Sequence, residues 1–258
     1  MARRVAVTGS ASGIGKALAA MLAEQGDVVI GVDRAGAEVC ADLGNAAGRQ
    51  QAVEQVRERC GGVLDALVTC AGIATPSAPL IAVNYFGTAQ LVEGLHPALA
   101  AAAAPRVAVV GSIAGTQPFD QDVVAACLDG DEPAALQRAT AAMERGEATK
   151  LYPSSKVAVA RWLRRTCVAP GWADAGIPLN AVAPGVVLTP MSGPMLASEK
   201  MRAVTDAAVP MPLNGHCPPE VIARALRWLS SEENTHITGQ VLYVDGGAEA
   251  TLRGPEVF

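Results

Sequence analysis

Aromatic residues, charges and metal-binding patterns are scarce in this sequence. Phe, Trp and Tyr make up 3% of its 258 residues, which argues against a protein that binds nucleic acid by base stacking. The net charge is −5 and no Lys/Arg cluster occurs, so neither nucleic acid nor an anionic membrane surface is expected as the main partner. The histidines, His96, His216 and His236, are far apart and have no metal-ligand spacing, so no metal is expected.

Disulfide and membrane-targeting patterns are missing as well. The 6 cysteines are scattered without a Cys-x-x-Cys pair, which is typical of reduced, mostly buried thiols in the cytoplasm. Arg3 and Arg4 precede an apolar run that ends at Thr8, which is too short for a signal peptide. The Ala-rich stretch Leu95–Ala104 is interrupted by Pro97, so no membrane span is expected. We therefore expect a cytoplasmic protein.

Hydrophobic residues make up 50% of the chain, and strand-like runs alternate with helical ones along its length. This pattern predicts an α/β fold, with helices on both faces of a doubly wound, mostly parallel sheet, in a single domain over residues 1–258. Residues 116–148 are acidic and Ala-rich and are predicted to be helical. Residues 186–217 are rich in proline and methionine, which predicts either a segment that covers a pocket or a plain surface loop.

Residues Val5–Gly15 carry the strongest functional signal. A strand-like run gives way to glycines at 9, 13 and 15, and a helical pattern starts at Lys16. Glycine allows positive φ angles and removes the Cβ that would keep a phosphate from the backbone, while the helix directs free N–H groups at the loop. A pyrophosphate is the natural ligand. The spacing differs from the standard Gly-x-Gly-x-x-Gly, so a turn without a ligand stays open on this stretch alone.

The next strand-like run, Val28–Val32, ends at Asp33. A carboxylate at this position commonly binds the adenosine ribose and repels a 2′-phosphate, which favours NAD over NADP. The neighbouring Arg34 could accept a 2′-phosphate, so NADP stays possible. After it, too few residues remain for the usual crossover helix, so the third strand must be short.

Tyr152 and Lys156 are four positions apart in a helical stretch, which places both side chains on one face. A tyrosine hydroxyl has a pKa of about 10, and a nearby ammonium lowers this pKa by favouring the phenolate. The pair could then act as a general acid or base near neutral pH. On its own, this spacing is weak evidence, because it more often belongs to two ordinary surface residues.

Taken in order, these motifs resemble the short-chain dehydrogenase/reductase family. The matching residues extend along the whole chain: Thr8, Gly9, Gly13, Gly15, Asp33, Asp42, Leu43, Ala71, Gly72, Asn84, Ser112, Tyr152, Lys156, Pro184, Gly185, Thr189 and Asp245–Gly247. The resemblance implies a Rossmann-type fold and an NAD(P)-dependent enzyme that interconverts a secondary alcohol and a ketone.

The resemblance also implies a role for each matching residue. Tyr152 would be the general acid or base, and Ser112 would hydrogen-bond the same substrate oxygen. Lys156 would lower the pKa of Tyr152 and bind the nicotinamide ribose, and Asn84 would hold a water that links Lys156 to solvent. The residues implied to bind the dinucleotide are Gly9, Ser12, Gly13, Ile14, Gly15, Asp33, Arg34, Asp42, Leu43, Ala71, Gly72, Tyr152, Lys156, Pro184, Gly185, Val187 and Thr189.

The sequence departs from the family pattern at several points. Cys70 stands where the family usually has asparagine before Ala-Gly, and the crossover helix before the third strand is missing. Only 11 residues separate Gly72 from Asn84, fewer than the family pattern leads us to expect. Ser112 and Tyr152 are 40 positions apart, far more than in most relatives, so residues 116–148 contain an insertion.

Within the family, Val83–Gly87 and a tail ending in Phe258 are similar to the bacterial 3α-hydroxysteroid dehydrogenase/carbonyl reductase group. That likeness implies oxidation of 3α-hydroxysteroids and reduction of ketones, and the Met-rich stretch favours a bulky apolar substrate. The alternatives are another dehydrogenase of the family, acting on a dihydrodiol, a sugar alcohol or an acyl-thioester ketone, and a non-catalytic dinucleotide sensor. We expect the insertion to cover the helix face through which relatives form tetramers, which leaves a homodimer.

Overall fold

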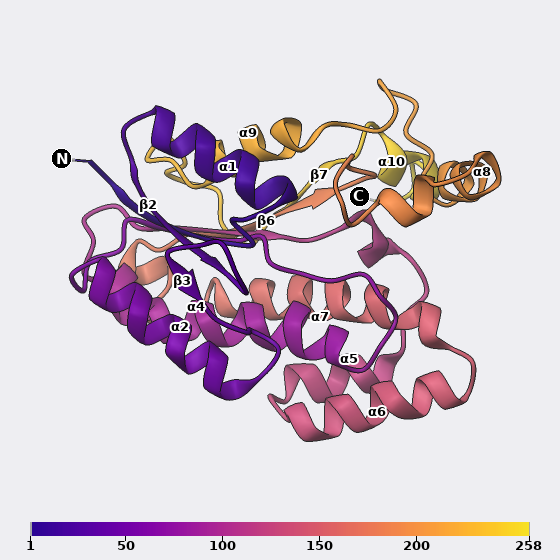
Figure 1. The fold of residues 1–258 in the computed structure, drawn as a ribbon, viewed down its shortest axis with the longest axis horizontal. Coiled ribbons are helices and arrows are strands. Elements are labelled where there is room, and N and C mark those ends of the chain that lie inside the picture. Colours follow the sequence, from indigo (N-terminus) through magenta and orange to yellow (C-terminus); the bar gives the residue numbers. More distant parts are fainter. Residues whose placement is uncertain (1, 258) are drawn as a thin grey trace.

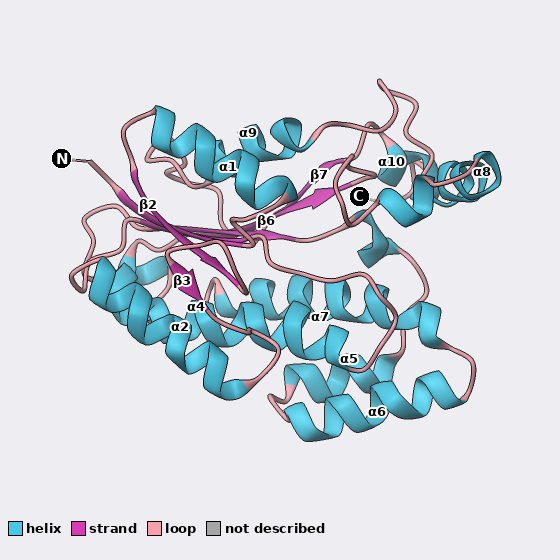
Figure 2. Ribbon diagram, in the orientation of Figure 1, coloured by secondary structure: helices cyan, strands magenta, loops and turns pink. Residues whose placement is uncertain are grey.

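A parallel sheet runs through the middle of the molecule (Figure 2). The computed structural model describes residues 2–257, so Phe258 of the tail noted above lies outside the described residues. Every strand pairing among the described residues is parallel, which confirms the predicted α/β class. In spatial order the strands are β3 (Val39–Cys40), β2 (Val28–Asp33), β1 (Arg4–Thr8), β4 (Ala66–Thr69), β5 (Arg106–Val110), β6 (Leu179–Pro184) and β7 (Val241–Val244).

Helices cover both faces of the sheet (Figure 1). One face carries α1 (Gly13–Glu24) and α9 (Pro219–Leu229), and the other carries α2 (Ala46–Arg59), α4 (Gly87–Ala100) and α7 (Leu151–Thr166). The side chains of strand β1 alternate between the two faces of the sheet. Val5 and Val7 pack with the α1 and α9 side chains, while Ala6 joins the core on the opposite face, as a period of two requires.

The early part of the chain has the short third strand that the sequence predicts. Strands β2 and β3 are joined without a helix, and β3 is very short. Asn45 caps the start of α2, because its Oδ1 accepts a hydrogen bond of 2.8 Å from the Gly48 N–H. Residues 79–100 are divided into α3 (Pro79–Ile81), a π-helical turn (Ala82–Phe86) and α4.

Residues 116–148 contain α5 (Gln121–Leu128) and α6 (Glu132–Glu144), so the predicted helical character is confirmed. The acidic residues of this stretch start these helices. Asp120 accepts hydrogen bonds from backbone N–H groups at the beginning of α5, and Asp131 does the same for α6. Helix α5 packs on α7 (Figure 1).

The chain after β6 is more regular than expected. It forms a short 3₁₀ turn (Gly193–Leu196) and helix α8 (Glu199–Ala208), which extends away from the sheet in Figure 1. Ser198 caps α8 by accepting a hydrogen bond of 3.2 Å from the Met201 N–H. A last helix, α10 (Ala248–Arg253), follows β7 and was also not predicted. None of the helices within residues 2–257 has both the length and the apolar character needed to cross a bilayer.

Candidate active site

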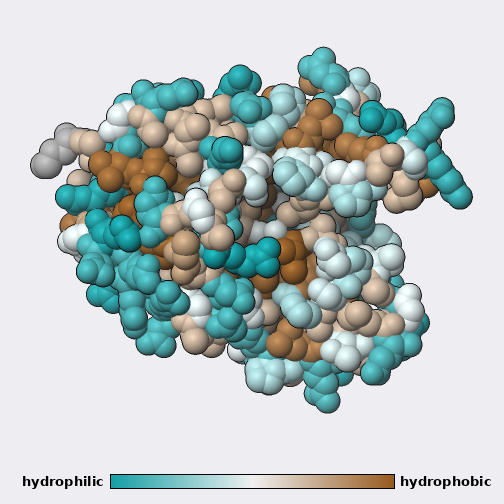
Figure 3. Space-filling model, in the orientation of Figure 1, coloured by the Kyte–Doolittle hydropathy of each residue, from teal (hydrophilic) through white to brown (hydrophobic). Residues whose placement is uncertain are grey.

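The carboxyl ends of the parallel strands meet at one edge of the sheet, and the predicted site residues gather there. Ser112 lies just beyond β5, and Tyr152 and Lys156 lie in the first turns of α7. Ser112 and Tyr152 are half-buried. Figure 3 shows the surface hollowed at this end, between the arm that contains α8 and the lobe formed by α5 and α6.

The loop between β1 and α1 is so compact that two of its glycines cannot be replaced without movement. Gly9 has φ +67°, and a Cβ there would lie 2.9 Å from the Ala71 nitrogen. A Cβ on Gly15 would overlap the carbonyl oxygen of Gly9. A Cβ on Gly13 would lie 3.3 Å from Thr189 Cγ2, so the segment that follows β6 reaches this loop. The structure thus brings Gly9, Gly13, Gly15, Ala71 and Thr189 together.

These features fit a dinucleotide. Ser12 precedes α1, and within the described chain its side chain makes no capping hydrogen bond, in contrast to Asn45 at α2. The first N–H groups of α1, from Gly13 and Ile14 onward, can therefore bind a pyrophosphate. Asp33 Oδ2 accepts a hydrogen bond of 3.0 Å from the Ala11 N–H, which joins the end of β2 to the same loop.

Arg34 and the turn at Asp42 and Leu43 lie further along this edge. The Arg34 side chain is exposed, and its backbone N–H donates to Asp33 Oδ1 at 2.7 Å. The exposed carboxylate of Asp42 accepts hydrogen bonds from the Gly44 N–H and from Asn45 Nδ2, at 2.9 and 3.1 Å. Leu43 is buried beneath it.

The side chain of Thr8 fixes the backbone at Cys70, the position where the family usually has asparagine. Its Oγ1 accepts hydrogen bonds from the N–H groups of Cys70 and Ala71, at 3.0 and 2.9 Å. The loop is therefore held by a neighbouring strand rather than by the side chain at position 70. Gly72 follows, and a Cβ there would lie 3.2 Å from Asn84 Oδ1.

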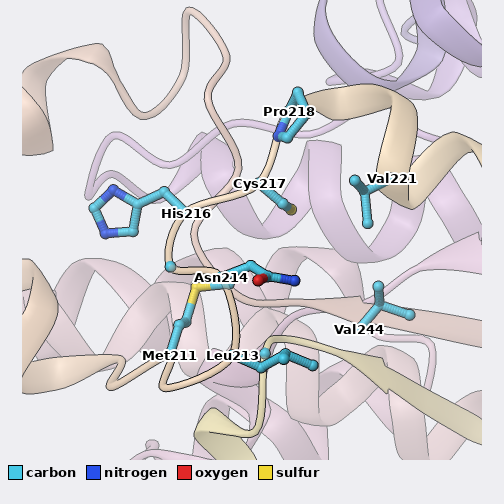
Figure 4. Close-up of a pocket in the computed structure, with 10 residues that line it drawn as sticks. Met211, Leu213, Asn214, His216, Cys217, Pro218, Val221 and Val244 are labelled. Carbon is cyan, nitrogen blue, oxygen red and sulfur yellow. The ribbon is translucent and has the colours of Figure 1, made fainter.

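The segment after β6 is anchored at Pro184 and Gly185. A Cβ on Gly185 would lie 2.8 Å from Met211 Sδ, and this sulfur accepts a hydrogen bond of 3.2 Å from the Val186 N–H. Val187 is buried and pairs with Cys217. Beside this anchor lies a cavity of about 150 Å³ whose lining includes Met211, Val221 and Val244. Figure 4 shows that His216 points away from the cavity, and it pairs with Asp206 of α8 at 2.7 Å.

Tyr152 and Ser112 are joined through their hydroxyl groups. Burial raises the pKa of Tyr152, and the hydrogen bond with Ser112 opposes this rise. The Lys156 Nζ lies 5.7 Å from the centre of the Tyr152 ring. In this structure Ser112, rather than Lys156, is the group that lowers the pKa of Tyr152.

The side chain of Lys156 is buried and is fixed by a backbone carbonyl group of strand β5. It is 7% exposed, and its Nζ donates a hydrogen bond of 2.9 Å to the Val110 carbonyl oxygen. Burial lowers the pKa of Lys156 to about 8, while Cys70 opposes the change. Burial also raises the pKa of the Cys70 thiol to about 12, so this thiol is neutral. The lysine therefore titrates close to physiological pH.

Asn84 lies in the π-helical turn and is linked to α7. Its Nδ2 donates to the Ile73 carbonyl oxygen and to Ser155 Oγ, at 2.9 and 3.2 Å. Ser155 Oγ in turn donates to the Tyr152 carbonyl oxygen at 2.8 Å. Ser155 is not among the residues predicted from the sequence, although a serine between a predicted tyrosine and lysine on one helix is a usable signal.

No group of three His, Cys, Asp or Glu side chains within residues 2–257 is arranged to hold a metal ion. The chain's cysteines are all free; Cys60, Cys127 and Cys167 are buried, Cys70 and Cys217 are half-buried, and Cys40 is exposed. The site can thus supply a phenol, a hydroxyl, an ammonium and a backbone cradle for an anion. This set suits proton transfer to or from an oxygen atom next to a bound dinucleotide.

Known proteins match the chain along nearly its whole length. Residues 3–126 match a family model described as short chain dehydrogenase, and residues 135–249 match one described as Enoyl-(Acyl carrier protein) reductase. The 3-alpha-hydroxysteroid dehydrogenase/carbonyl reductase of Comamonas testosteroni is 33% identical over 254 residues, which cover 96% of this chain and 97% of that protein. The cis-4-hydroxycyclohexanecarboxylate dehydrogenase of Sinomonas cyclohexanicum is 32% identical over 96% of this chain and 98% of its own length.

A solved structure extends this likeness to the fold. The crystal structure of the 3-alpha-hydroxysteroid dehydrogenase from Pseudomonas sp. B-0831, complexed with NADH, is 43% identical to this chain. The match covers 99% of this chain and 100% of that one, with a TM-score of 0.91. The likeness therefore includes the elements that carry the glycine loop, Ser112, Tyr152 and Lys156.

Proposed function

We propose that the substrates of this chain are 3α-hydroxysteroids, 3-ketosteroids or similarly bulky carbonyl compounds. The chain belongs to the short-chain dehydrogenase/reductase family and is an NAD(P)-dependent oxidoreductase that interconverts alcohols and ketones. The observation that carries the proposal is the hydrogen-bonded Ser112–Tyr152 pair, with Lys156 Nζ 5.7 Å from the tyrosine ring, beside a glycine loop that fits a dinucleotide.

The dinucleotide would be held along the carboxyl edge of the sheet. Gly9, Gly13 and Gly15 would let the backbone approach the pyrophosphate, with Ser12 and Ile14 at the start of α1. The further residues proposed to bind the cofactor are Asp33, Arg34, Asp42, Leu43, Ala71, Gly72, Tyr152, Lys156, Pro184, Gly185, Val187 and Thr189. When bound, the cofactor supplies or accepts the hydride, while the protein provides positioning and proton transfer.

The position of Asp33 favours NAD. Its carboxylate is fixed against the glycine loop by the Ala11 and Arg34 N–H groups, at 3.0 and 2.7 Å, and would repel a 2′-phosphate. The Arg34 guanidinium, on an exposed side chain, leaves acceptance of NADP possible. The NADH complex of the relative from Pseudomonas sp. B-0831 supports the same preference.

Tyr152 would give its proton to the carbonyl oxygen during reduction and take it from the alcohol during oxidation. Ser112 would hydrogen-bond the same oxygen and stabilise the phenolate, as its effect on the pKa of Tyr152 supports. The positive charge of Lys156 would also favour the phenolate once the lysine is protonated. Both protons of the Asn84 amide already have acceptors, so Asn84 could hold a water near Lys156 only by accepting a hydrogen bond.

The segment 186–217 would cover the substrate. Met191, Met195 and Met201 are 43%, 38% and 44% exposed. These flexible apolar side chains are therefore not packed in the core and can contact a substrate. A bulky apolar substrate suits this lining better than a sugar alcohol does. The relative from Sinomonas cyclohexanicum, named for a hydroxylated cyclohexane acid, supports other cyclic secondary alcohols as the second candidate.

The assembly and location of the enzyme are part of this proposal. Helix α5 packs on α7 and covers one face of that helix, which supports a homodimer rather than a tetramer. The free cysteines fit the reducing cytoplasm. Light scattering that gives a tetrameric mass would contradict the dimer.

The substrate class is tested by NADH formation with the 3α- and 3β-epimers of one hydroxysteroid. The panel also contains cyclic alcohols, dihydrodiols and sugar alcohols, each with NAD and with NADP. We expect the 3α-epimer with NAD to give the highest kcat/KM. If the steroids are inert while another alcohol reacts, the family chemistry stands and the steroid assignment is wrong.

A further inference from the structure

A buried arginine joins the α5–α6 pair to the turn that follows β3. Arg49 lies in α2 and is 2% exposed. Its guanidinium has partners from separate parts of the fold. The Nη2 group forms an ion pair with Glu132 of α6, and Nε donates to Gln90 Oε1 on α4 at 2.8 Å. The Nη1 group donates to the Leu43 carbonyl oxygen at 3.0 Å.

The hydrogen bond from Arg49 to the Leu43 carbonyl oxygen connects this arginine to the proposed cofactor site. Asp42 and Leu43 form the turn that would bind the adenine end of the dinucleotide. The exposed Asp42 carboxylate is fixed by Gly44 and Asn45 from the solvent side, whereas Arg49 holds the backbone of the turn from the protein interior. A Cβ on Gly48 would overlap the Asp42 carbonyl oxygen, so α2 presses directly against this turn.

The arginine needs Glu132 to remain in this position. A buried guanidinium without a counter-charge is costly, and a long charged side chain moves to water when a route exists. Such a route is present, because a groove of about 430 Å³ beside Arg49 is lined by Gln50, Val53 and Gln90 (the α2 and α4 helices of Figure 1). If Arg49 turned into this groove, the Leu43 carbonyl oxygen would lose its donor.

We propose that Arg49 is a positioning residue for the adenine end of the cofactor site, and that Glu132 of the α5–α6 pair holds it in that role. The inference rests on the proposed function, since it takes the turn at Asp42 and Leu43 as part of the NAD site. The α5–α6 pair thereby acts on cofactor affinity without touching the cofactor. The substitution Glu132→Gln should raise the KM for NAD and leave kcat nearly unchanged, because it removes binding shared by the ground and transition states.

The test compares wild-type protein, Glu132→Gln and the control Asp122→Asn. Asp122 lies on α5 and pairs with Arg138 at 3.6 Å, and both side chains are exposed. The dissociation constants of NADH and of AMP are measured by titration. We expect Glu132→Gln to bind both about tenfold more weakly, in line with the loss of a buried hydrogen bond, while Asp122→Asn binds as wild-type. Equal affinities for wild-type and Glu132→Gln would overturn the proposal.

A double variant separates positioning from stability. The substitutions Arg49→Met and Glu132→Met together replace the ion pair by apolar side chains, a change that often preserves stability. We expect its Tm to stay near the wild-type value while NADH and AMP still bind about tenfold more weakly, because the Leu43 carbonyl has no donor. Wild-type affinity in this variant would assign the pair a purely structural role. Wild-type protein that binds neither NADH nor AMP would instead overturn the proposed function itself.

Discussion

Replacing Lys156 by methionine is expected to make the cofactor-free protein more stable while it destroys activity. Burial lowers the pKa of Lys156 from an ordinary 10.5 to about 8. One pKa unit corresponds to about 1.4 kcal/mol, so keeping the charged lysine in the fold costs about 3 kcal/mol. Methionine removes this cost but also the hydrogen bond to the Val110 carbonyl oxygen, a loss of about 1 kcal/mol. The net gain is about 2 kcal/mol, or about 4–8 °C in Tm for a domain of this size.

The gain should depend on pH in a defined direction. Between about pH 8 and 10.5 the unfolded chain keeps the Lys156 proton that the folded chain has lost. The contribution of Lys156 to the free energy of unfolding of the wild-type protein therefore rises with pH in this range. The advantage of Lys156→Met is therefore full below about pH 8 and disappears toward pH 10.5.

Urea unfolding without nucleotide, at pH 7 and at pH 10, measures this difference between variant and wild-type. Lys200→Met is the control, because Lys200 is exposed and its replacement should change little at either pH. A Lys156→Met variant that is no more stable than wild-type at pH 7 would refute the reasoning. An advantage that is equally large at both pH values would refute it as well.

The remaining predictions concern the cofactor loop. Gly15→Ala would place a methyl group against the Gly9 carbonyl oxygen, so NADH should bind at least about tenfold more weakly by titration. Gly26→Ala is the control. A Cβ there meets nothing within 4 Å but the residue has φ +90°, so the change should lower Tm without changing the affinity for NADH. Wild-type NADH affinity in Gly15→Ala would contradict the proposed cradle. Asp33→Ser should lower kcat/KM with NAD and raise it with NADP, and an unchanged ratio of the two would remove Asp33 as the discriminating residue.

Features that depend on short stretches of sequence were predictable. The glycine loop, the strand ending at Asp33 and the cap at Asn45 are each set by residues within one or two turns of one another. The helices within 116–148 also follow from local signals, since Asp120 and Asp131 start them. Family likeness singled out Ser112, Tyr152 and Lys156, and the structure has all three at one edge of the sheet.

Features that depend on distant partners were not predictable. From the sequence alone, Arg49 would be expected to be an exposed residue of α2. Only the fold brings Glu132, which is 83 positions away, to its guanidinium group. The pKa of Lys156 follows from burial, which no spacing of residues reveals. The link from Asn84 through Ser155 requires the π-helical turn. Helix α8 had a usable signal in Ser198, but the surrounding prolines and methionines favoured a loop.

The measurement that tests the central claim most directly is the turnover of Tyr152→Phe beside Tyr85→Phe. Each change removes one phenolic hydroxyl from a side chain that is at least half-buried, but Tyr85 packs against Phe86, and Ser112 is not among the groups that shift its pKa. With 3α-hydroxysteroid and NAD, we expect kcat to fall by about 10²- to 10⁴-fold in Tyr152→Phe and to change little in Tyr85→Phe. NADH binding should be nearly unchanged in both. Wild-type turnover by Tyr152→Phe would contradict the assignment of Tyr152 as the proton-transfer group.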